Sequence, residues 1–298
     1  MKILAEGLAF PEGPVVMPDE SVVVVELRAG TVRRIWGEGR SEVIATPGGG
    51  PNGAQIGPDG ALYVANNGGI DWTRGLSAPD TGRIERVDPA TGKIERLCDH
   101  ADGRPLRAPN DLVFDAAGGL WFTDMGKTID GAVETSAVCY LRPDGTCVAG
   151  YRGGISYNGI GLSPDERFVY VAETQSARLW RFAVEAPGVL GKPEWVATAP
   201  GDTRFDSLAV TASGNICVGT LKTGGITTIG PDGGTAFTPI DDLYVTNIAF
   251  GGADMRTAFI TLAASGKLIA MDWPEPGLPL YFGYTTSSTT SSTRPSGS

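Results

Sequence analysis

Histidine is scarce in this chain of 298 residues, which contains only His100. One histidine excludes a metal site built from several imidazoles. A serine nucleophile would also lack a suitable base, because His100 lies in the segment LCDHADG and no GxSxG element occurs. The cysteines show no CxxC spacing, so we expect free thiols rather than a zinc framework or a disulfide scaffold; they are Cys98, Cys139, Cys147 and Cys217.

Long apolar runs and an excess of positive charge are also missing. No run approaches the ~20 apolar residues needed to cross a bilayer, and the first residues lack an apolar stretch typical of a signal peptide. The 24 basic residues face 34 acidic ones, a net charge of −10, which disfavours nucleic acid and anionic membranes. We therefore expect a cytoplasmic protein, a monomer or small homo-oligomer, that acts on a small molecule.

Glycine and proline, in contrast, are abundant, and they mark a repeat. There are 43 glycines and 21 prolines, together 64 of 298 residues, where average usage is roughly one in eight. One unit recurs along the chain: a polar residue, then an apolar run, then a turn such as Pro-Asp-Gly, and then a β-rich run. The copies are PEGPVVMPDESVVVVE from residue 11, PNGAQIGPDGALYVAN from 51, PNDLVFDAAGGLWFTD from 109, YNGIGLSPDERFVYVAE from 157, FDSLAVTASGNICVGT from 205 and, more weakly, TNIAFGGADMRTAFITL from 246.

The second residue of each copy is polar, and we call these six residues the polar ring: Glu12, Asn52, Asn110, Asn158, Asp206 and Asn247. They recur at intervals of 40, 58, 48, 48 and 41 residues, the period of propeller blades. The sequence predicts an all-β fold over residues 1–282, a six-bladed β-propeller of four-stranded antiparallel blades. KILAEGLAF should complete the last blade beside GKLIAMDW, and residues around GGIDWTRGLSAPD should form an inserted loop. Residues 283–298 read as a flexible Ser/Thr-rich or vector-derived tail.

Equivalent positions of a propeller surround its axis, so the polar ring should gather at one mouth of the central channel. Oxygen ligands with two carboxylates suit a hard divalent cation. We expect one such cation, Ca²⁺, Mg²⁺ or Mn²⁺. Turn or cap formation is the other interpretation of Asn and Asp at strand starts.

These motifs resemble a known family, the SMP-30/gluconolactonase/luciferin-regenerating-enzyme-like proteins, in its bacterial lactonase branch. FPEGP at 10–14, PND at 109–111, YNG at 157–159 and FDS at 205–207 carry the resemblance, together with the six-unit spacing. It implies a divalent cation bound by Glu12, Asn158 and Asp206, with Ca²⁺ preferred and Mg²⁺, Mn²⁺, Zn²⁺ or Fe²⁺ as alternatives. It implies Asp206 as the general base or as the carboxylate that orients the attacking water. It also implies that Asn110 contacts the substrate.

Further substrate contacts are expected from Asn52, Arg107 and Tyr157. Mammalian members of the family have an arginine two residues before the equivalent of Asn110, whereas this chain has Ala108 there. Arg107 is one residue further from Asn110. Because side chains alternate along a strand, it should point in a different direction from the mammalian arginine. The departure leaves open which lactone is the substrate.

The expected function is therefore metal-dependent hydrolysis of a lactone, which would be a sugar lactone or a related cyclic ester. Two alternatives remain: the same metal site acting on an aromatic lactone or an organophosphate, and a non-catalytic propeller scaffold with a structural cation. Few charged groups flank the expected mouth, and Trp72 and Met125 are candidate apolar walls. Asn66 and Asn67 are possible partners for hydroxyl groups, so sugar lactones stay among the expected substrates. We expect less hydroxylated or aromatic lactones to be accepted at least as well as gluconolactone.

Overall fold

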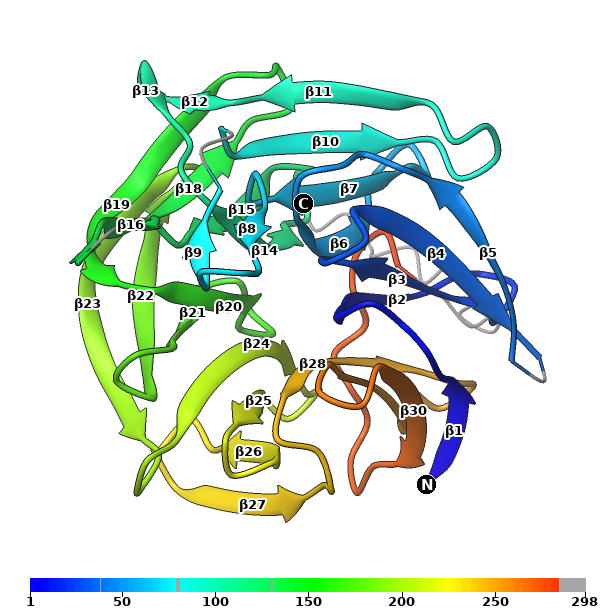
Figure 1. Cartoon of the computed structure of the whole chain (residues 1–298). Helices are drawn as coiled ribbons and strands as arrows, with labels where there is room; N and C mark the ends of the chain where they lie inside the picture. Colours follow the sequence, from blue (N-terminus) through cyan, green and yellow to red (C-terminus); the bar gives the residue numbers. More distant parts are fainter. Residues whose placement is uncertain (38, 79–80, 130, 284–298) are drawn as a thin grey trace, which may run out of the picture.

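The computed structural model describes residues 1–37, 39–78, 81–129 and 131–283, and these form thirty β-strands with no helix among them. Six four-stranded antiparallel sheets are arranged around a central axis (Figure 1). The protein is thus a six-bladed β-propeller, which confirms the predicted fold class. None of the described residues forms a helix long and apolar enough to cross a membrane.

Each blade begins with its innermost strand and continues outward. The first blade contains β2 (Pro11–Val16), β3 (Val22–Glu26), β4 (Thr31–Trp36) and β5 (Arg40–Ala45). The second contains β6 (Pro51–Ile56), β7 (Leu62–Asn66), β10 (Arg83–Val87) and β11 (Ile94–Cys98). The third contains β14 (Pro109–Phe114), β15 (Leu120–Asp124), β18 (Thr135–Leu141) and β19 (Cys147–Ile155). The fourth blade contains β20 (Tyr157–Leu162), β21 (Phe168–Glu173), β22 (Arg178–Ala186) and β23 (Val189–Thr198). The fifth contains β24 (Arg204–Val210), β25 (Ile216–Leu221), β26 (Gly225–Ile229) and β27 (Thr235–Pro239).

The sixth blade joins the two ends of the chain. It contains β28 (Val245–Gly251), β29 (Thr257–Leu262) and β30 (Lys267–Asp272), and β1 (Lys2–Ala5) is its outermost strand. Ile3 lies opposite Ile269 in this antiparallel pair, as expected for KILAEGLAF and GKLIAMDW. Each innermost strand contacts its counterpart in the next blade, including β28 with β2. The ring is therefore closed, and the inner edges of the six sheets are protected inside it.

The core lies between the blades, because both faces of each sheet pack against a neighbouring sheet. All five residues of β3 are buried, whereas four of the six in the outer strand β5 are exposed. Valine-rich β3 suits this position, since β-branched side chains pack well on a pleated surface. Burial thus falls from the inner strands of a blade to its outermost strand.

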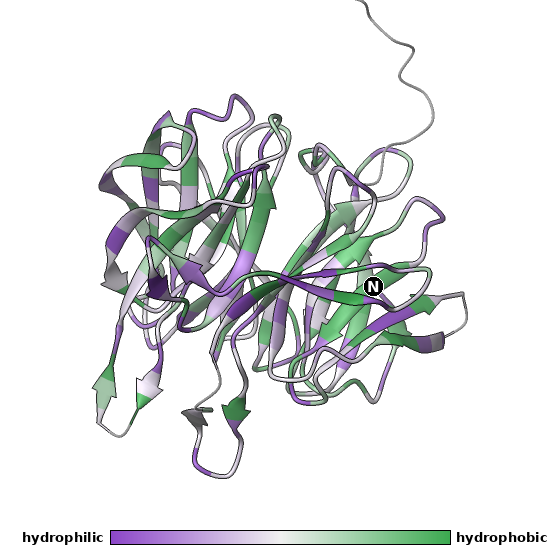
Figure 2. Cartoon of the chain, turned by 90° about the horizontal axis from the view of Figure 1, so that it is seen from above, coloured by the Kyte–Doolittle hydropathy of each residue, from purple (hydrophilic) through white to green (hydrophobic). Residues whose placement is uncertain are grey.

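Short hairpins lie outside the blade pattern. One is β8 (Ile70–Asp71) with β9 (Leu76–Ser77), another is β16 (Thr128–Ile129) with β17 (Ala132–Val133), and a third is β12 (His100–Ala101) with β13 (Arg104–Pro105). The first accounts for the predicted insertion. β9 and β16 contact each other, and two hairpins project from one face of the propeller in Figure 2. We call this the site face, because the innermost strands begin there.

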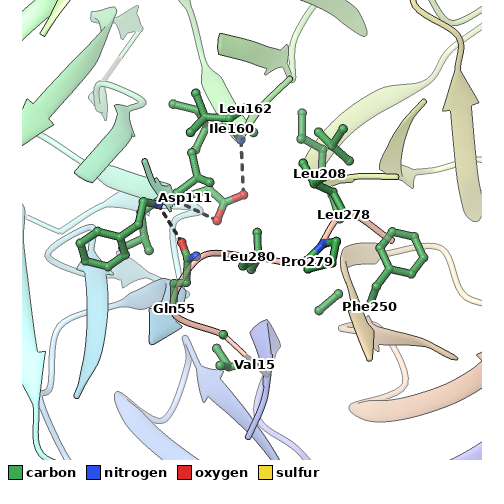
Figure 3. Close-up of a pocket in the computed structure, with 18 of the residues that line it drawn as sticks. Val15, Gln55, Asp111, Ile160, Leu162, Leu208, Phe250, Leu278, Pro279 and Leu280 are labelled. Atoms are coloured by element: carbon green, nitrogen blue, oxygen red, sulfur yellow. Dashed lines mark hydrogen bonds between the residues drawn. The ribbon is translucent and has the colours of Figure 1, made fainter. Parts of the chain in front are cut away.

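The opposite face is closed by residues 276–283, which follow the last blade. Leu278 donates its backbone N–H to Val210, and the Phe282 ring packs edge-on against Phe114 at 5.6 Å. A cavity of about 180 Å³ lies between this segment and the channel wall, with Asp111 and Gln55 among its lining residues (Figure 3). Of the expected tail 283–298, all but Gly283 lies outside the described residues.

Candidate metal and substrate site

The polar ring occupies equivalent positions at the start of the six innermost strands, on the site face of the channel. All six side chains are buried; Glu12 is 2% exposed and Asp206 is 6% exposed. Because each innermost strand contacts the next, the six positions surround the axis. The repeat spacing therefore predicted their gathering correctly.

A β-bulge accompanies the polar ring in every blade. In the third blade, Pro109 pairs with Asp124 but Leu112 pairs with Phe122, so Asn110 and Asp111 together face the single residue Thr123. The other five inner pairs also shift register next to the residue of the polar ring. A bulge bends the strand and turns side chains away from the regular alternation. The bulges explain why two successive residues of one strand reach the interior of the channel.

Hydrogen bonds join neighbours around the polar ring. Asn247 Nδ2 donates to Glu12 Oε2 at 3.2 Å, which connects the last blade to the first. Ser207 Oγ donates to Asn158 Oδ1 at 3.3 Å, and the Asn158 side chain also hydrogen-bonds to Asp206. The three residues that the family resemblance implies as ligands are therefore held by side chains of adjacent blades.

Two buried oxygen atoms of the polar ring have no hydrogen-bond partner. They are Oδ1 of Asn52 and Oδ1 of Asn110, although Asn110 Nδ2 lies 3.8 Å from Met125 Sδ. Leaving a buried polar atom unpaired costs about 1–3 kcal/mol. Unpaired acceptors beside two buried carboxylates are what a site for a cation or a hydroxyl-bearing ligand requires. The donor set therefore fits a hard divalent cation.

A third carboxylate, Asp111, stands beside the polar ring and was missed in the sequence. It accepts hydrogen bonds from the backbone N–H of Leu112 at 2.9 Å and of Ile160 at 3.4 Å (Figure 3). Three other copies of the repeat have glycine at this position. A carboxylate where the repeat favours glycine is the feature that could have identified Asp111.

Burial disfavours the ionised form of these acids. It raises the pKa of Glu12 well above its usual range, and the carboxylates of Asp206 and Asp111 raise it further. Burial also raises the pKa of Asp206 to about 8, although the hydrogen bond from Asn158 acts in the opposite direction and lowers it. The pKa of Asp111 is raised to about 7, again by burial. A bound cation would reverse this effect, because an opposite charge favours the ionised carboxylate.

These shifts predict how the stability of the chelated protein depends on pH. The folded-state pKa values of Asp111 and Asp206, about 7 and about 8, exceed the unfolded value of about 3.9. The folded state therefore binds more protons, and its stability falls as pH rises from about 4 to about 8. Urea unfolding at pH 5 and pH 8 in EDTA should show this loss. Asp111→Asn should reduce the slope; an unchanged or rising stability in wild type would contradict the account.

Glycines let the innermost strands approach closely at the polar ring. A Cβ on Gly159 would lie 2.6 Å from the backbone nitrogen of Leu208 and 2.8 Å from the carbonyl oxygen of Asp206. We expect Gly159→Ala to displace Asn158 and Asp206 and to lower both the melting temperature and cation affinity. The control is Gly37→Ala, whose nearest neighbour is the flexible Arg40 side chain at 3.4 Å. Equal effects of the two variants would show that the approach at Gly159 is unimportant.

Two of the expected substrate contacts have other partners in the fold. Tyr157 is 2% exposed and lies in the apolar core with Trp121 and Phe182, so its ring packs between blades. The Arg107 guanidinium donates from Nε and Nη2 to the Glu134 carboxylate at 2.9 Å. Glu134 follows the β16–β17 hairpin, and Arg107 thus holds this hairpin at the site face.

Other residues singled out in the sequence also take structural roles. Asn66 is fully buried, and its side-chain amide forms hydrogen bonds with Gly48, Gly50 and Glu85. His100 is exposed and pairs with Asp99 at 2.7 Å. The four cysteines are free thiols, as expected. Within the described ranges, no group of three or more His, Cys, Asp and Glu side chains is placed to hold a metal; the expected ligand set contains two carboxylates and an amide.

The fold and the site place the chain in the class of closed six-bladed propellers with a buried ring of carboxyl and carboxamide side chains at one end of the axis. The chain belongs to the SMP-30/gluconolactonase/LRE-like family, whose model matches residues 10–264. The match spans all six copies of the repeat, and it confirms the family resemblance seen in the sequence.

Named relatives and a solved structure are consistent with this assignment. The chain is 27% identical to a gluconolactonase of Zymomonas mobilis over 63% of this chain and 56% of that protein. It is 33% identical to the lactonase drp35 of Staphylococcus aureus over 56% of this chain and 49% of that protein. The chain thus spans about half the length of these curated relatives. The structure of a gluconolactonase from Xanthomonas campestris superimposes with a TM-score of 0.75 at 25% identity, covering 91% of this chain and 89% of that chain.

Proposed function

We propose that this protein is a divalent-cation-dependent lactonase that opens a cyclic ester with water at the polar ring. The observation that carries the proposal is the polar ring itself, whose possible metal ligands are all oxygen atoms. It combines two buried carboxylates, Glu12 and Asp206, with unpaired amide oxygens on Asn52 and Asn110. Relatives named gluconolactonase and lactonase share the family and support the reaction class.

Glu12, Asn158 and Asp206 would hold the cation, with Ca²⁺ as the first candidate. The two carboxylates supply opposite charge, and the amide oxygen of Asn158 adds a neutral ligand of the hard type. When bound, the cation supplies Lewis acidity that polarises the ester carbonyl. Asn247 and Ser207 fix the orientation of Glu12 and Asn158 through the bonds described above.

Asp206 is the proposed general base. A carboxylate in this position can accept a proton from the attacking water, provided that it is ionised. Opposite charge nearby favours that form, whereas without it burial keeps the pKa of Asp206 at about 8. The proton is afterwards available for the leaving alkoxide of the opened ring. Proton transfer at Asp206 is thus coupled to the binding of the cation at the polar ring.

Asn52 and Asn110 remain the proposed substrate contacts. Their unpaired Oδ1 atoms can accept hydrogen bonds from hydroxyl groups of a bound lactone. Arg107 remains a proposed contact only at the edge of the site, since Glu134 holds its guanidinium. Tyr157 is withdrawn as a contact, because its ring lies in the core between blades.

The test combines elemental analysis of the purified protein with a hydrolysis panel of gluconolactone, a pentonolactone, dihydrocoumarin and an organophosphate ester. We expect a bound divalent cation and lactone turnover. Turnover of the organophosphate alone would assign the site to another electrophile. A tightly bound cation with no turnover of any ester would instead indicate a binding scaffold.

A further inference from the structure

Three aromatic side chains from separate parts of the chain meet at the site face; we call Phe10, Trp72 and Tyr244 the aromatic rim. The Phe10 ring centroid lies 5.3 Å from that of Trp72 and 6.4 Å from that of Tyr244. Phe10 is two residues before Glu12, and Tyr244 is three residues before Asn247. At about 3.3 Å per extended residue, both lie close to the polar ring.

Phe10 is held in an unusual backbone conformation. Its φ of +61° lies in the left-handed region, where a bulky residue is an outlier. The backbone N–H groups of Leu27 and Arg28 donate to the carbonyls of Phe10 and Ala9 at 3.0 and 3.1 Å. Glu26 accepts from the N–H of Ala9 at 2.9 Å. The fold therefore maintains a strained conformation beside the site, a feature that clusters at functional positions.

Contacts also hold the Trp72 ring and the backbone of Tyr244 in place. The Arg28 guanidinium lies 4.4 Å from the centre of the Trp72 ring, and Asp71 Oδ1 accepts from the N–H of Thr73 at 3.0 Å in the same turn. Tyr244 donates its N–H to Asp242 and accepts from the N–H of Ala263. Anchored aromatic side chains lose little conformational entropy on binding, which favours tight contacts.

Although anchored, the rim exposes apolar surface to solvent. Trp72 is 38% and Tyr244 is 45% exposed, and the neighbouring Leu243 is 62% exposed. Exposed aromatic rings from separate loops beside a buried polar site are typical of recognition surfaces. Of the polar groups expected to bind hydroxyls near this mouth, Asn66 is bonded to the backbone and to Glu85, and Arg107 is bonded to Glu134. The unpaired acceptors Asn52 Oδ1 and Asn110 Oδ1 belong to the polar ring, so the rim itself favours an apolar, planar group.

We infer that the aromatic rim is a binding subsite for the planar apolar part of an aryl-fused lactone. The inference rests on the proposed function, and it identifies the substrate class of that site. The ester group would lie at the polar ring, and the fused ring would stack on Trp72 and Tyr244 over Phe10. Aromatic pairs prefer offset or tilted arrangements at 4.5–7 Å, as in the contacts of Phe10 with its two neighbours.

The experiment measures binding without turnover. The probes are two lactams that resist hydrolysis: 3,4-dihydroquinolin-2-one, which carries the fused ring, and δ-valerolactam, which lacks it. Calorimetry on the calcium-loaded protein should give at least tenfold tighter binding of the fused lactam. Trp72→Ala and Tyr244→Ala should each remove most of this difference. The ratio of kcat/KM for dihydrocoumarin to that for gluconolactone should fall in parallel.

Trp195 provides the matched control, because it is 61% exposed on the outer strand β23, away from the axis. Trp195→Ala should leave the preference for the fused lactam intact. Equal affinities of the two lactams for wild type would overturn the subsite, as would a change of oligomeric state in Trp72→Ala with no effect on lactam binding. Selective lactam binding without turnover of any lactone would support the subsite and refute the proposed hydrolysis.

Discussion

Asp206→Asn should lower kcat for lactone hydrolysis by roughly 10²- to 10⁴-fold, the usual contribution of a general base, when measured at saturating cation. The substitution keeps the size of the side chain and an oxygen ligand, but an amide cannot accept the proton from water. It also removes one of the two carboxylates of the polar ring, so cation affinity should fall. Saturation with cation separates the two effects.

The matched control for this variant is Asp241→Asn, an exposed aspartate on the loop before the last blade. It should retain wild-type kcat. The affinity of both variants for cation is measured first by calorimetry, so that saturation is established. A kcat of Asp206→Asn within threefold of wild type, with the site saturated, would eliminate Asp206 as the base.

Glu12→Gln should weaken cation binding on the order of 100-fold, since even partners that only orient metal ligands contribute 10- to 100-fold. Without cation the same variant should be more stable than wild type at pH 8. Burial and the carboxylates of Asp206 and Asp111 oppose ionisation of Glu12, and glutamine removes that unfavourable charge. The variant is therefore expected to be stabilised in EDTA and to gain less stability from added cation.

Calorimetric titration and urea unfolding measure the two effects on one preparation. Glu42→Gln, on the exposed outer strand β5, serves as the control and should match wild type in both. Lower stability of Glu12→Gln in EDTA would show that Glu12 stabilises the fold without a cation, which would contradict its assignment as a ligand.

The repeat period predicted the blades, the closure of the ring by β1 and the gathering of the polar ring. These features follow from turn chemistry and strand alternation, which recur at fixed spacing. The β-bulge breaks that alternation, because two residues such as Asn110 and Asp111 face one residue of the next strand. Strand alternation therefore gave no reason to single out Asp111, and Tyr157 was expected to contact substrate although its ring lies in the apolar core.

Features that depend on contacts between distant segments were beyond the reach of the sequence pattern. Residues 276–283 close the far end of the channel through contacts with Val210 and Phe114, and nothing in their composition identifies those partners. The aromatic rim is similar, because Phe10, Trp72 and Tyr244 belong to different loops. The pairing of Arg107 with Glu134 likewise joins residues 27 positions apart.

One measurement tests the central claim most directly: the rate of lactone hydrolysis by the protein before chelation, after removal of the metal, and after return of Ca²⁺. The account predicts loss of activity in the chelated protein and its recovery on reloading. Glu12→Gln should need on the order of 100-fold more Ca²⁺ for the same recovery. Undiminished turnover by protein shown to be metal-free would contradict the claim that the polar ring works as a cation site.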